Sequence, residues 1–527
     1  MKWWSRLTED KKADVSIYGL SALLSLLLSL WVSVRVTVIN PDAICYLSSA
    51  AVANMGLSTM MHLCGQAIWP FYSLLIFSVS KITSLSYLVA ANTIDAFFTA
   101  MTVVTFVAIT QMFGASKRVM CLAAATILLC HQFNDVRQYI VRDHGYWAFY
   151  LMSIYFLLHF MQKSKMSHAI AWSVTLLLAT LFRIEGAIFL ITLPFVMLFK
   201  VNTPILRRVQ YIGILCLPVI LISTGIAGWL AYHPDQTLHV FGRVSDVVVQ
   251  LREGWQAVLD RYQSVTHALI DHVLPVEAIR DAGAVWMSVL LFLYLQNISL
   301  NLSLIYTFLF LYALQSRLLP GSFQAKMVVI GYALVNLVVT FVFFIEHLFL
   351  AKRYMIALTL TLMLWVPFAL ERLLKRTLSE KKWILSSIVS FCICVSAAGG
   401  IFDFGRDKTY IRQAGDWLAE NVPPEATLYA NDHQLMYYSQ HFKEDLFIKF
   451  KEYDHIEDMI PHWQSYQYIA LRLSRDEKDN TKERFLITEM DLYPLQTFSN
   501  RDGDQVIIFT TVVAPDMRPI ELLDSKK

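Results

Sequence analysis

Several small groups of acidic and basic residues interrupt long apolar runs in the first 401 residues. Ionisable side chains at the edge of a membrane are costly and are therefore functional candidates. A carboxylate can act as a general base, and an arginine can bind phosphate through two hydrogen bonds. The residues concerned are Asp42, Asp135, Arg137, Arg142, Asp143, His144, Arg183, Glu185, Glu346, His347, Lys352 and Arg353.

The apolar runs that carry these groups predict a polytopic α-helical membrane protein. The chain is 56% hydrophobic, has only 16% charged residues, and has a mean hydropathy of +0.49. A helix of about 20 apolar residues crosses a bilayer. We expect about eleven crossings, at 15–38, 84–113, 119–134, 146–161, 169–182, 184–199, 209–231, 284–314, 326–345, 354–370 and 383–401. The run at 67–80 is interpreted as an interfacial or re-entrant helix, because counting it as a crossing breaks the alternation of basic loops.

The distribution of basic residues predicts the orientation, since lysine and arginine collect in cytoplasmic loops. With the N-terminus in the cytoplasm, every predicted inside loop is basic: 116–118, 163–165, 200–208, 317–326 and 371–382. The mixed acid and base groups then fall outside, within 39–66, 135–145, 183–186, 232–283 and 346–353. An odd number of crossings places the C-terminus outside too, in the periplasm of a bacterium.

A change in composition divides the chain near residue 401. Residues 402–527 hold 15 lysines and arginines against 23 aspartates and glutamates. We therefore predict a multi-pass membrane domain at 1–401 and a small soluble α/β domain at 402–527. The expected elements are helices at 408–421 and 433–439 and strands at 426–430, 466–473 and 505–513. Nothing in this domain looks catalytic, and we expect it to shape the entrance for an acceptor.

Several classes of function are disfavoured by the sequence. There is no P-loop, no GxGxxG and no GxSxG, which argues against a nucleotide-binding enzyme or an ATP-driven pump. No Cys and His spacing resembles a zinc site, and a net charge of +3 gives no reason to expect nucleic acid. Cys45 and Cys64 share the first outside loop, where they could form a disulfide or remain two buried thiols.

The layout resembles that of the GT-C glycosyltransferases, in the branch of the protein O-mannosyltransferases and the lipid A aminoarabinose transferase. The resemblance covers most of the chain, although none of its motifs is diagnostic alone. One departure is that Ala43 follows Asp42, where many relatives have a second acid. The segments that carry the resemblance are INPDAICY at 39–46, WPFY at 69–72, RDH at 142–144, His347 with KRY at 352–354, and IRQAGDWLAENVP at 411–423.

This resemblance implies a reaction and roles for particular residues. A sugar would move, with inversion, from a polyprenyl-phosphate carrier to a lipid, glycan or protein acceptor on the outer face. Asp42 would be the base, Asp143 a second acid that orients the acceptor, and Arg353, Lys352 and Arg183 would bind the donor phosphate. Supporting roles would fall to Arg142, His144, Glu185, Glu346, His347 and Tyr354. No cofactor and no metal are expected in this branch, although Asp42 and Asp143 could in principle share a divalent cation.

Structural interpretations of the same residues remain open. Asp42 could cap a helix after Pro41, and Asp143 could pair with Arg142 or Arg137. Lys352 and Arg353 could extend from the membrane boundary toward water. Two other functions also fit a polytopic chain, namely a polysaccharide polymerase or ligase and a transporter or flippase. The 126-residue tail argues against the first, and the absence of internal repeats argues against the second.

Overall fold

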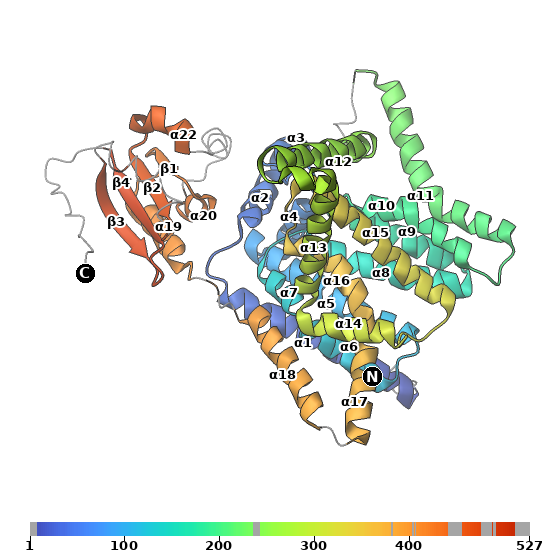
Figure 1. Cartoon of the computed structure of the whole chain (residues 1–527). Helices are drawn as coiled ribbons and strands as arrows, with labels where there is room; N and C mark the ends of the chain where they lie inside the picture. Colours follow the sequence, from blue (N-terminus) through green and yellow to red (C-terminus); the bar gives the residue numbers. More distant parts are fainter. Residues whose placement is uncertain are drawn as a thin grey trace. The chain divides into compact units, whose positions relative to one another are not determined.

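The computed structural model describes residues 8–235, 243–380, 383–402, 405, 407–440, 456–475, 487 and 492–511. The chain forms two compact units (Figure 1). We call the first the helical unit; it contains Met1–Ser33, Asn92–Gln138 and Arg142–Asp403. We call the second the mixed unit; it contains Val34–Ala91, Tyr139–Val141 and Phe404–Lys527. The second unit thus groups the predicted soluble domain with the first outside loop, and the predicted boundary at 401 stays a prediction.

The apolar runs of the sequence lie largely in helices. Among the described residues, seven helical stretches are long and apolar enough to cross a membrane, so the chain is a multi-pass membrane protein. They are α1 (Glu9–Arg35), α5 (Tyr87–Met112), α11 (Ile205–Tyr232), α13 with the turn before it (Val276–Leu302), α15 (Phe323–His347), Lys352–Thr377, which contains α16 (Ile356–Leu362) and most of α17 (Val366–Ser379), and α18 (Trp383–Ile401).

The remaining predicted crossings are shorter or less uniformly apolar. Lys117–Leu128 (α6) and His131–Gln138 (α7 with a 3-10 turn) form an eighth candidate if they count as one span, with a bend of 53° between them. The total of eleven crossings therefore stays a prediction. The other helices on predicted crossings are α8 (Asp143–Lys163), α9 (Met166–Phe182), α10 (Gly186–Thr192) and α14 (Leu304–Gln315).

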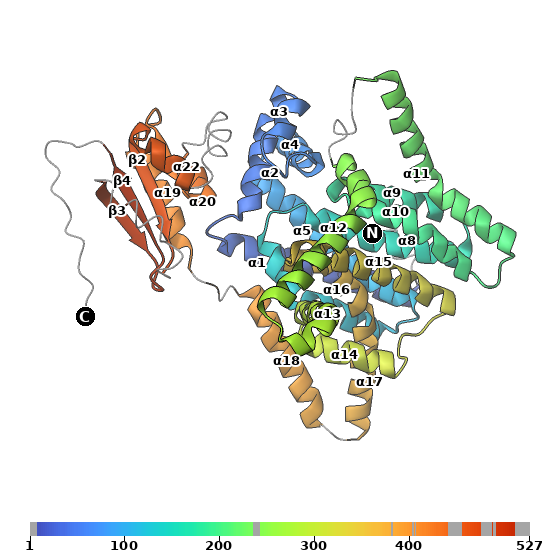
Figure 2. The same ribbon diagram turned by 45° about the horizontal axis from the view of Figure 1, so that its top comes forward.

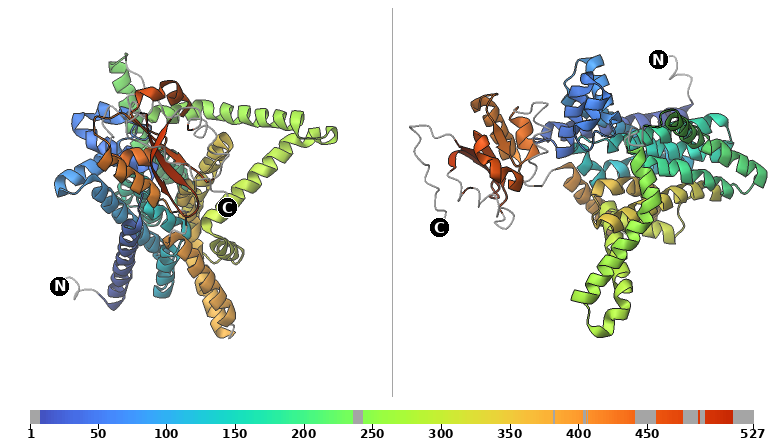
Figure 3. Two further views of the ribbon diagram at one scale, coloured as in Figure 1. Left: turned by 90° about the vertical axis from the view of Figure 1, so that its left-hand side faces the viewer. Right: turned by 90° about the horizontal axis from the view of Figure 1, so that it is seen from above.

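Two features of the helical unit differ from the sequence prediction. The run at 284–314 is two helices, α13 (Ala282–Leu302) and α14, because Ser303 between them has a positive φ of 66°. The predicted outside loop at 232–283 contains a 29-residue helix, α12 (Val244–His272), whose mixed polar and apolar pattern lacks the apolar length of a crossing. Figure 3 shows that α12 and α13 form a hairpin that projects from the other helices of this unit.

Helix α8 forms the centre of the helical unit. Its side chains Trp147, Tyr150 and Ser153 are buried, and α9 and α15 pack against it. The Tyr150 hydroxyl lies 2.7 Å from the Thr361 hydroxyl and accepts a hydrogen bond from Asn336. Because buried polar groups of this kind need partners, the network fixes how α8 is placed against α15 and α16. The packing of α8 also positions Asp143, the first residue of this helix.

The mixed unit contains a four-stranded sheet in the order β1-β2-β4-β3, of which Figure 2 labels β2, β4 and β3. The strands are β1 (Leu428–Ala430), β2 (Tyr468–Leu473), β3 (Tyr493–Ser499) and β4 (Gln505–Thr510). Strand β2 runs parallel to β1 and antiparallel to β4, with Ile469 opposite Phe509. Helices α19 (Thr409–Asn421) and α20 (His433–Tyr438) also form as predicted, whereas β3 was not predicted from the sequence.

Both faces of this sheet are covered. Ala470 and Val506 belong to one apolar cluster with residues of α19 and α20. Ile469 and Phe509 belong to a second cluster with Met459 of α22 (Ile456–Met459) on the opposite face. The alternation follows from the two-residue period of a strand. One face of the sheet thus packs against α19 and α20 and holds these helices in place.

The first-loop segment of the mixed unit is helical. It contains α2 (Pro41–Ala51), a 3-10 turn (Val52–Met55), α3 (Leu57–His62) and α4 (Phe71–Thr83). The last of these covers most of the run predicted as interfacial or re-entrant, and it is too short to cross a membrane by itself. Asn40 precedes α2 in an extended conformation, and Pro41 is its first residue, a position that suits proline.

Candidate active site

An ion triad, with Arg183 and Asp143 buried and the Glu185 side chain 34% exposed, joins three helices of the helical unit. Arg183 Nη1 donates a hydrogen bond to Asp143 Oδ1, and Arg183 Nη2 donates to Glu185 Oε1 at 2.5 Å. Asp143 begins α8, Arg183 follows α9, and Glu185 precedes α10. The Arg183 and Asp143 side chains are only 11% and 5% exposed. Residues from two separate outside groups of the sequence thus form one site.

Two glycines permit this close approach. A Cβ atom on Gly145 would lie 2.4 Å from the ring of Phe182, at the end of α9. A Cβ atom on Gly186 would lie 2.8 Å from the backbone nitrogen of Thr180. Any larger residue would force α8 and α9 apart or open the turn at 183–186. Gly145, two residues after Asp143, and Gly186, next to Glu185, therefore help to keep Arg183 between its two carboxylates.

The Glu185 carboxylate and the Arg183 guanidinium stay ionised near neutral pH. Burial by itself would raise the pKa of Glu185, but the Arg183 charge and hydrogen bonds, with a smaller effect from Arg142, lower it to about 2. Burial opposes the charge of Arg183 in turn, yet Asp143 and Glu185 raise the pKa of Arg183 well above its ordinary value. The three groups together carry a net charge of −1, with the arginine shared between two acids.

Two further arginines lie at this triad. The ring centroid of Tyr354 lies 4.6 Å from the guanidinium carbon of Arg183 and 5.4 Å from that of Arg353. A cation within about 6 Å of an aromatic centroid is attracted to the ring face. Arg142 is buried, and its Nη1 has no hydrogen-bond partner among the described residues. With Arg142 and Arg353 included, the site carries a net charge of +1, which suits an anion.

Tyr146 completes the aromatic side of the site. Its ring centroid lies 5.8 Å from the guanidinium carbon of Arg183, and the Tyr146 side chain is buried. Tyr146 was not among the site residues predicted from the sequence. Its position one helical turn after Arg142 was the available signal, because residues three or four apart lie on one face of a helix.

His144 points away from the triad. Its Nδ1 lies 3.3 Å from the Thr99 hydroxyl of α5, and its ring meets Trp147 edge to face at 5.2 Å. Successive residues of a helix are about 100° apart, so Asp143 and His144 face different neighbours. Thr99 also donates to the backbone oxygen of Asp95, a buried acid of α5 that the sequence analysis did not select.

The group before residue 354 is only partly directed at the site. The Lys352 side chain is exposed, and its backbone oxygen accepts a hydrogen bond from Asn301. His347 stacks on Phe343 with 4.2 Å between centroids, and Phe343 in turn meets Tyr354 at 5.3 Å. Glu346 Oε2 lies 3.9 Å from His347 Nδ1. Glu346 and His347 therefore lie at the edge of the site. The rings of Phe343 and Tyr354 lie between His347 and Arg183.

Asp135 and Arg137 were grouped with Asp143 by sequence, yet Arg137 serves helix packing. Its Nη1 donates to the hydroxyls of Ser25 and Ser29 of α1 at 3.1 and 2.9 Å. Its Nε donates to Asn134 at 2.7 Å. The guanidinium is thus committed to α1 and α7, outside the triad.

Asp42 lies in the mixed unit, in the first turn of α2. Gln66 Nε2 donates to Asp42 Oδ1 at 3.0 Å. A disulfide between Cys45 and Cys64 resolves the alternative that the sequence left open. Asp42 and Cys45 are three residues apart and share a face of α2, so the disulfide holds the segment with Gln66 beside the carboxylate. Gln66 was not foreseen, since its sequence separation from Asp42 gives no sign of the contact.

Within the described part of the chain, no three His, Cys, Asp or Glu side chains gather closely enough to hold a metal ion. Asp42 and Asp143 belong to different units, and each unit is described by itself. The sequence-based proposal that these two acids share one cavity therefore stays a prediction.

Comparisons with known proteins agree with this architecture. No family model and no curated protein matches the sequence. The structure of ArnT from Cupriavidus metallidurans bound to undecaprenyl phosphate matches at a TM-score of 0.54 and 16% identity, over 95% of this chain and 98% of that one. Its apo state matches at a TM-score of 0.51 and 13% identity, over 94% and 97%.

The archaeal oligosaccharyltransferase AglB from Archaeoglobus fulgidus also matches, at a TM-score of 0.49 and 13% identity, over 94% of this chain and 74% of that one. The two ArnT structures match nearly the whole of both chains. ArnT is the lipid A aminoarabinose transferase, a GT-C glycosyltransferase. The chain therefore has the GT-C glycosyltransferase fold, as the resemblance of its sequence predicts.

Proposed function

We propose that this protein is an inverting glycosyltransferase that moves a sugar from a polyprenyl-phosphate carrier to an acceptor on the outer face of the membrane. The observation that carries the proposal is a net-positive cluster, formed by the buried Arg142 and Arg183 with the half-buried Arg353, in a chain with the fold of ArnT. A membrane-bound sugar phosphate needs such a cluster, because its leaving group is an anionic lipid phosphate.

Arg353 and Arg142 are the residues best placed to bind the donor phosphate. Arg353 is half-buried and lies against Tyr354, and Arg142 has a buried nitrogen without a hydrogen-bond partner among the described residues. Arginine suits phosphate because its planar group can donate two parallel hydrogen bonds. Lys352 is exposed and would contribute mainly long-range attraction. ArnT, which shares this fold, has been seen with undecaprenyl phosphate.

Arg183 has a different part in this proposal from the one its sequence position implied. Its Nε, Nη1 and Nη2 all donate to Asp143 or Glu185. We infer that it mainly positions Asp143 and Tyr354 and adds charge, while Asp143 orients the acceptor. Tyr354 would lie between Arg183 of the triad and Arg353, which would bind the phosphate.

Asp42 is the proposed base. Its carboxylate would take the proton of the acceptor hydroxyl or amine as that oxygen or nitrogen attacks the anomeric carbon. The bond between that carbon and the phosphate oxygen breaks, and the polyprenyl phosphate leaves with the electron pair. The hydrogen bond from Gln66 supports this role because it fixes one carboxylate oxygen in the first turn of α2.

The proposed setting is the inner, or plasma, membrane, with the N-terminus in the cytoplasm and the C-terminus outside. A disulfide between Cys45 and Cys64 supports an outside position for the first loop, since disulfides persist in oxidising compartments. By its resemblance to the branch described above, the reaction is proposed to need no metal. Membranes treated with a chelator should therefore keep their activity.

The test compares the masses of envelope lipids, glycans and proteins from cells with and without the gene. A glycosyltransferase adds one sugar mass to a defined acceptor. A change in glycan chain length without a newly modified acceptor would instead indicate a polymerase or ligase. Uptake of a solute into vesicles without any new covalent product would indicate a transporter.

A further inference from the structure

We propose that Gln434 and Tyr438 are positioning residues for Asp42, so that the C-terminal part of the mixed unit takes part in catalysis by holding the base. The inference rests on the proposed function of Asp42. Helix α20 binds the backbone of Ile39, three residues before Asp42, with two of its side chains. This contact lies wholly within the mixed unit.

The contact satisfies both backbone polar groups of one buried residue. The Ile39 N–H donates to the Tyr438 hydroxyl at 2.9 Å, and the Ile39 carbonyl accepts from Gln434 Nε2 at 2.6 Å. Ile39, Gln434 and Tyr438 are 7%, 4% and 6% exposed. Gln434 and Tyr438 are four residues apart, so they project from the same face of α20. A buried residue whose backbone N–H and C=O are both hydrogen-bonded in this way has little freedom to shift.

The next residue is held from another direction. The Asn40 side chain accepts a hydrogen bond from the Ile140 N–H at 2.9 Å and donates to the Ile140 carbonyl at 3.3 Å. Asn40 is extended, and Pro41, with its fixed φ, begins α2 immediately afterwards. These contacts and the proline ring therefore hold the backbone from Ile39 to Pro41 in a single conformation. Asp42 follows directly, in the first turn of α2.

The helix that makes this contact is itself anchored on the sheet. Asp432 caps α20 by accepting from the Gln434 and Leu435 backbone N–H groups, and it pairs with Arg472 of β2 at 2.6 Å. The ring of Tyr438 lies under the Arg412 guanidinium at 4.2 Å. A Cβ atom on Gly415 would lie 2.4 Å from the Tyr438 Cβ, so α19 and α20 are in close contact. The sheet thus holds α20 in place, and α20 in turn holds Ile39, three residues before Asp42.

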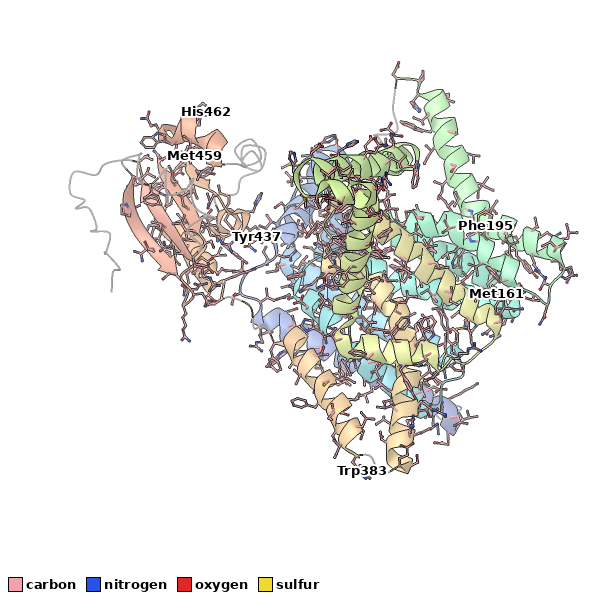
Figure 4. All side chains as sticks on the ribbon, viewed as in Figure 1. Met161, Phe195, Trp383, Tyr437, Met459 and His462 are labelled. Carbon is pink, nitrogen blue, oxygen red and sulfur yellow. A yellow bond between two sulfur atoms is a disulfide. The ribbon has the colours of Figure 1, made fainter. Side chains whose placement is uncertain are left out.

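Two pairs of variants test this role in the full-length protein. Tyr438→Phe and Gln434→Leu each remove a hydrogen bond to Ile39; phenylalanine keeps the ring, and leucine keeps an apolar side chain of similar bulk. Tyr437→Phe and Gln413→Leu are the matched controls. Tyr437, labelled in Figure 4, is next to Tyr438 on α20, and Gln413 is on an exposed face of α19. Hydrogen exchange at the 39–46 segment, undecaprenyl phosphate binding and the envelope product are measured for all four.

We expect Tyr438→Phe and Gln434→Leu to speed exchange at 39–46, with β4 unchanged, and to lower the product about tenfold or more, because misplacing a catalytic group by about 1 Å can cost about a hundredfold. Their affinity for undecaprenyl phosphate should stay within about twofold of wild type, since the proposed phosphate ligands belong to the helical unit. A protein that merely unfolds would lose this binding as well. If either variant does not fold, the other carries the test.

The other outcomes separate this inference from the function on which it rests. Faster exchange with full product yield, or unchanged exchange, would overturn the positioning role. The same would follow if Tyr437→Phe and Gln413→Leu lowered the product equally. An Asp42→Asn variant is measured in parallel: if it keeps full activity, the proposed function fails and the inference fails with it. If it is inactive while Tyr438→Phe and Gln434→Leu are fully active, only the inference fails.

Discussion

Arg183 donates a hydrogen bond to Asp143 across the contact between α8 and α9, in a position where both side chains are almost fully buried. Forty residues of sequence separate them, yet the packing of Phe182 against Gly145 brings their backbones together. The pair links the second acid of the proposed site to the aromatic ring of Tyr354 and so to Arg353. The side chains of Asp143, Arg183, Tyr354 and Arg353 are thus connected by a continuous series of contacts.

The first prediction concerns this buried pair. Arg183→Lys should lower the product by about a hundredfold, because lysine cannot bind Asp143 and Glu185 at once through a planar group. It should also destabilise the protein, because one carboxylate would lose its hydrogen bonds, and a buried group left without its hydrogen-bond partner costs about 1–3 kcal/mol. Product yield and the melting temperature of the purified protein measure the two effects. Arg207→Lys, an exposed arginine in a predicted cytoplasmic loop, is the control. Wild-type activity in Arg183→Lys would show that the triad is not part of the site.

The second prediction concerns pH. The pKa of Glu185 is lowered from 4.5 to about 2 in the folded state, so its contribution to stability is complete above pH 4.5 and is lost as the pH falls toward 2. The melting temperature of wild type should therefore fall more steeply between these pH values than that of Glu185→Gln. Above pH 5 the gap between the two proteins should be constant. Parallel curves across the acid range would mean that Glu185 is not held ionised by Arg183.

The third prediction concerns the lipid phosphate. Arg353→Ala should weaken binding of undecaprenyl phosphate about 10- to 100-fold, the equivalent of a charged hydrogen bond worth about 1.5–3 kcal/mol. Lys352→Ala should weaken it less, because the Lys352 side chain is exposed to solvent, which screens its charge. Mass spectrometry of the intact protein with bound lipid, repeated at two salt concentrations, measures both. Equal loss in the two variants would argue for general attraction of an anion in place of a specific contact.

The fourth prediction concerns the Cys45–Cys64 disulfide. Replacing both cysteines with serine should lower the free energy of unfolding by about 2–4 kcal/mol and should reduce activity, because Gln66 would no longer be held beside Asp42. Cys121→Ser, an exposed free cysteine, should have neither effect. Maleimide labelling of the denatured, unreduced wild-type protein should leave Cys45 and Cys64 unmodified. Labelling at both would show that the thiols are reduced.

Much of the fold follows from local patterns in the sequence. Apolar runs of helical length predict the helices of the helical unit, and β-branched and aromatic runs predict β1, β2 and β4. The break at Ser303 has no glycine or proline to mark it, so the sequence predicts one helix there instead of two. Helix α12 is missed because its charged residues resemble a solvated loop, and β3 is missed because its run contains Pro494 and alternates weakly.

The candidate site could be predicted only as a set of residue groups. Clustering at the ends of apolar runs selects Asp143, Arg183 and Arg353, which the structure brings together in the helical unit. The direction of each side chain depends on tertiary packing, which is why His144 was grouped with its neighbour although it faces Thr99. Uncharged partners such as Gln66 carry no comparable signal.

The central claim is that the Asp42 carboxylate performs the transfer, and its most direct test is the envelope product in cells that produce Asp42→Asn. The amide is similar in size to the carboxylate but cannot accept a proton at neutral pH. At equal protein levels in the membrane, we expect loss of the added sugar mass by at least about a hundredfold, with undecaprenyl phosphate binding retained. The same sugar mass at wild-type abundance in the Asp42→Asn cells would contradict the claim.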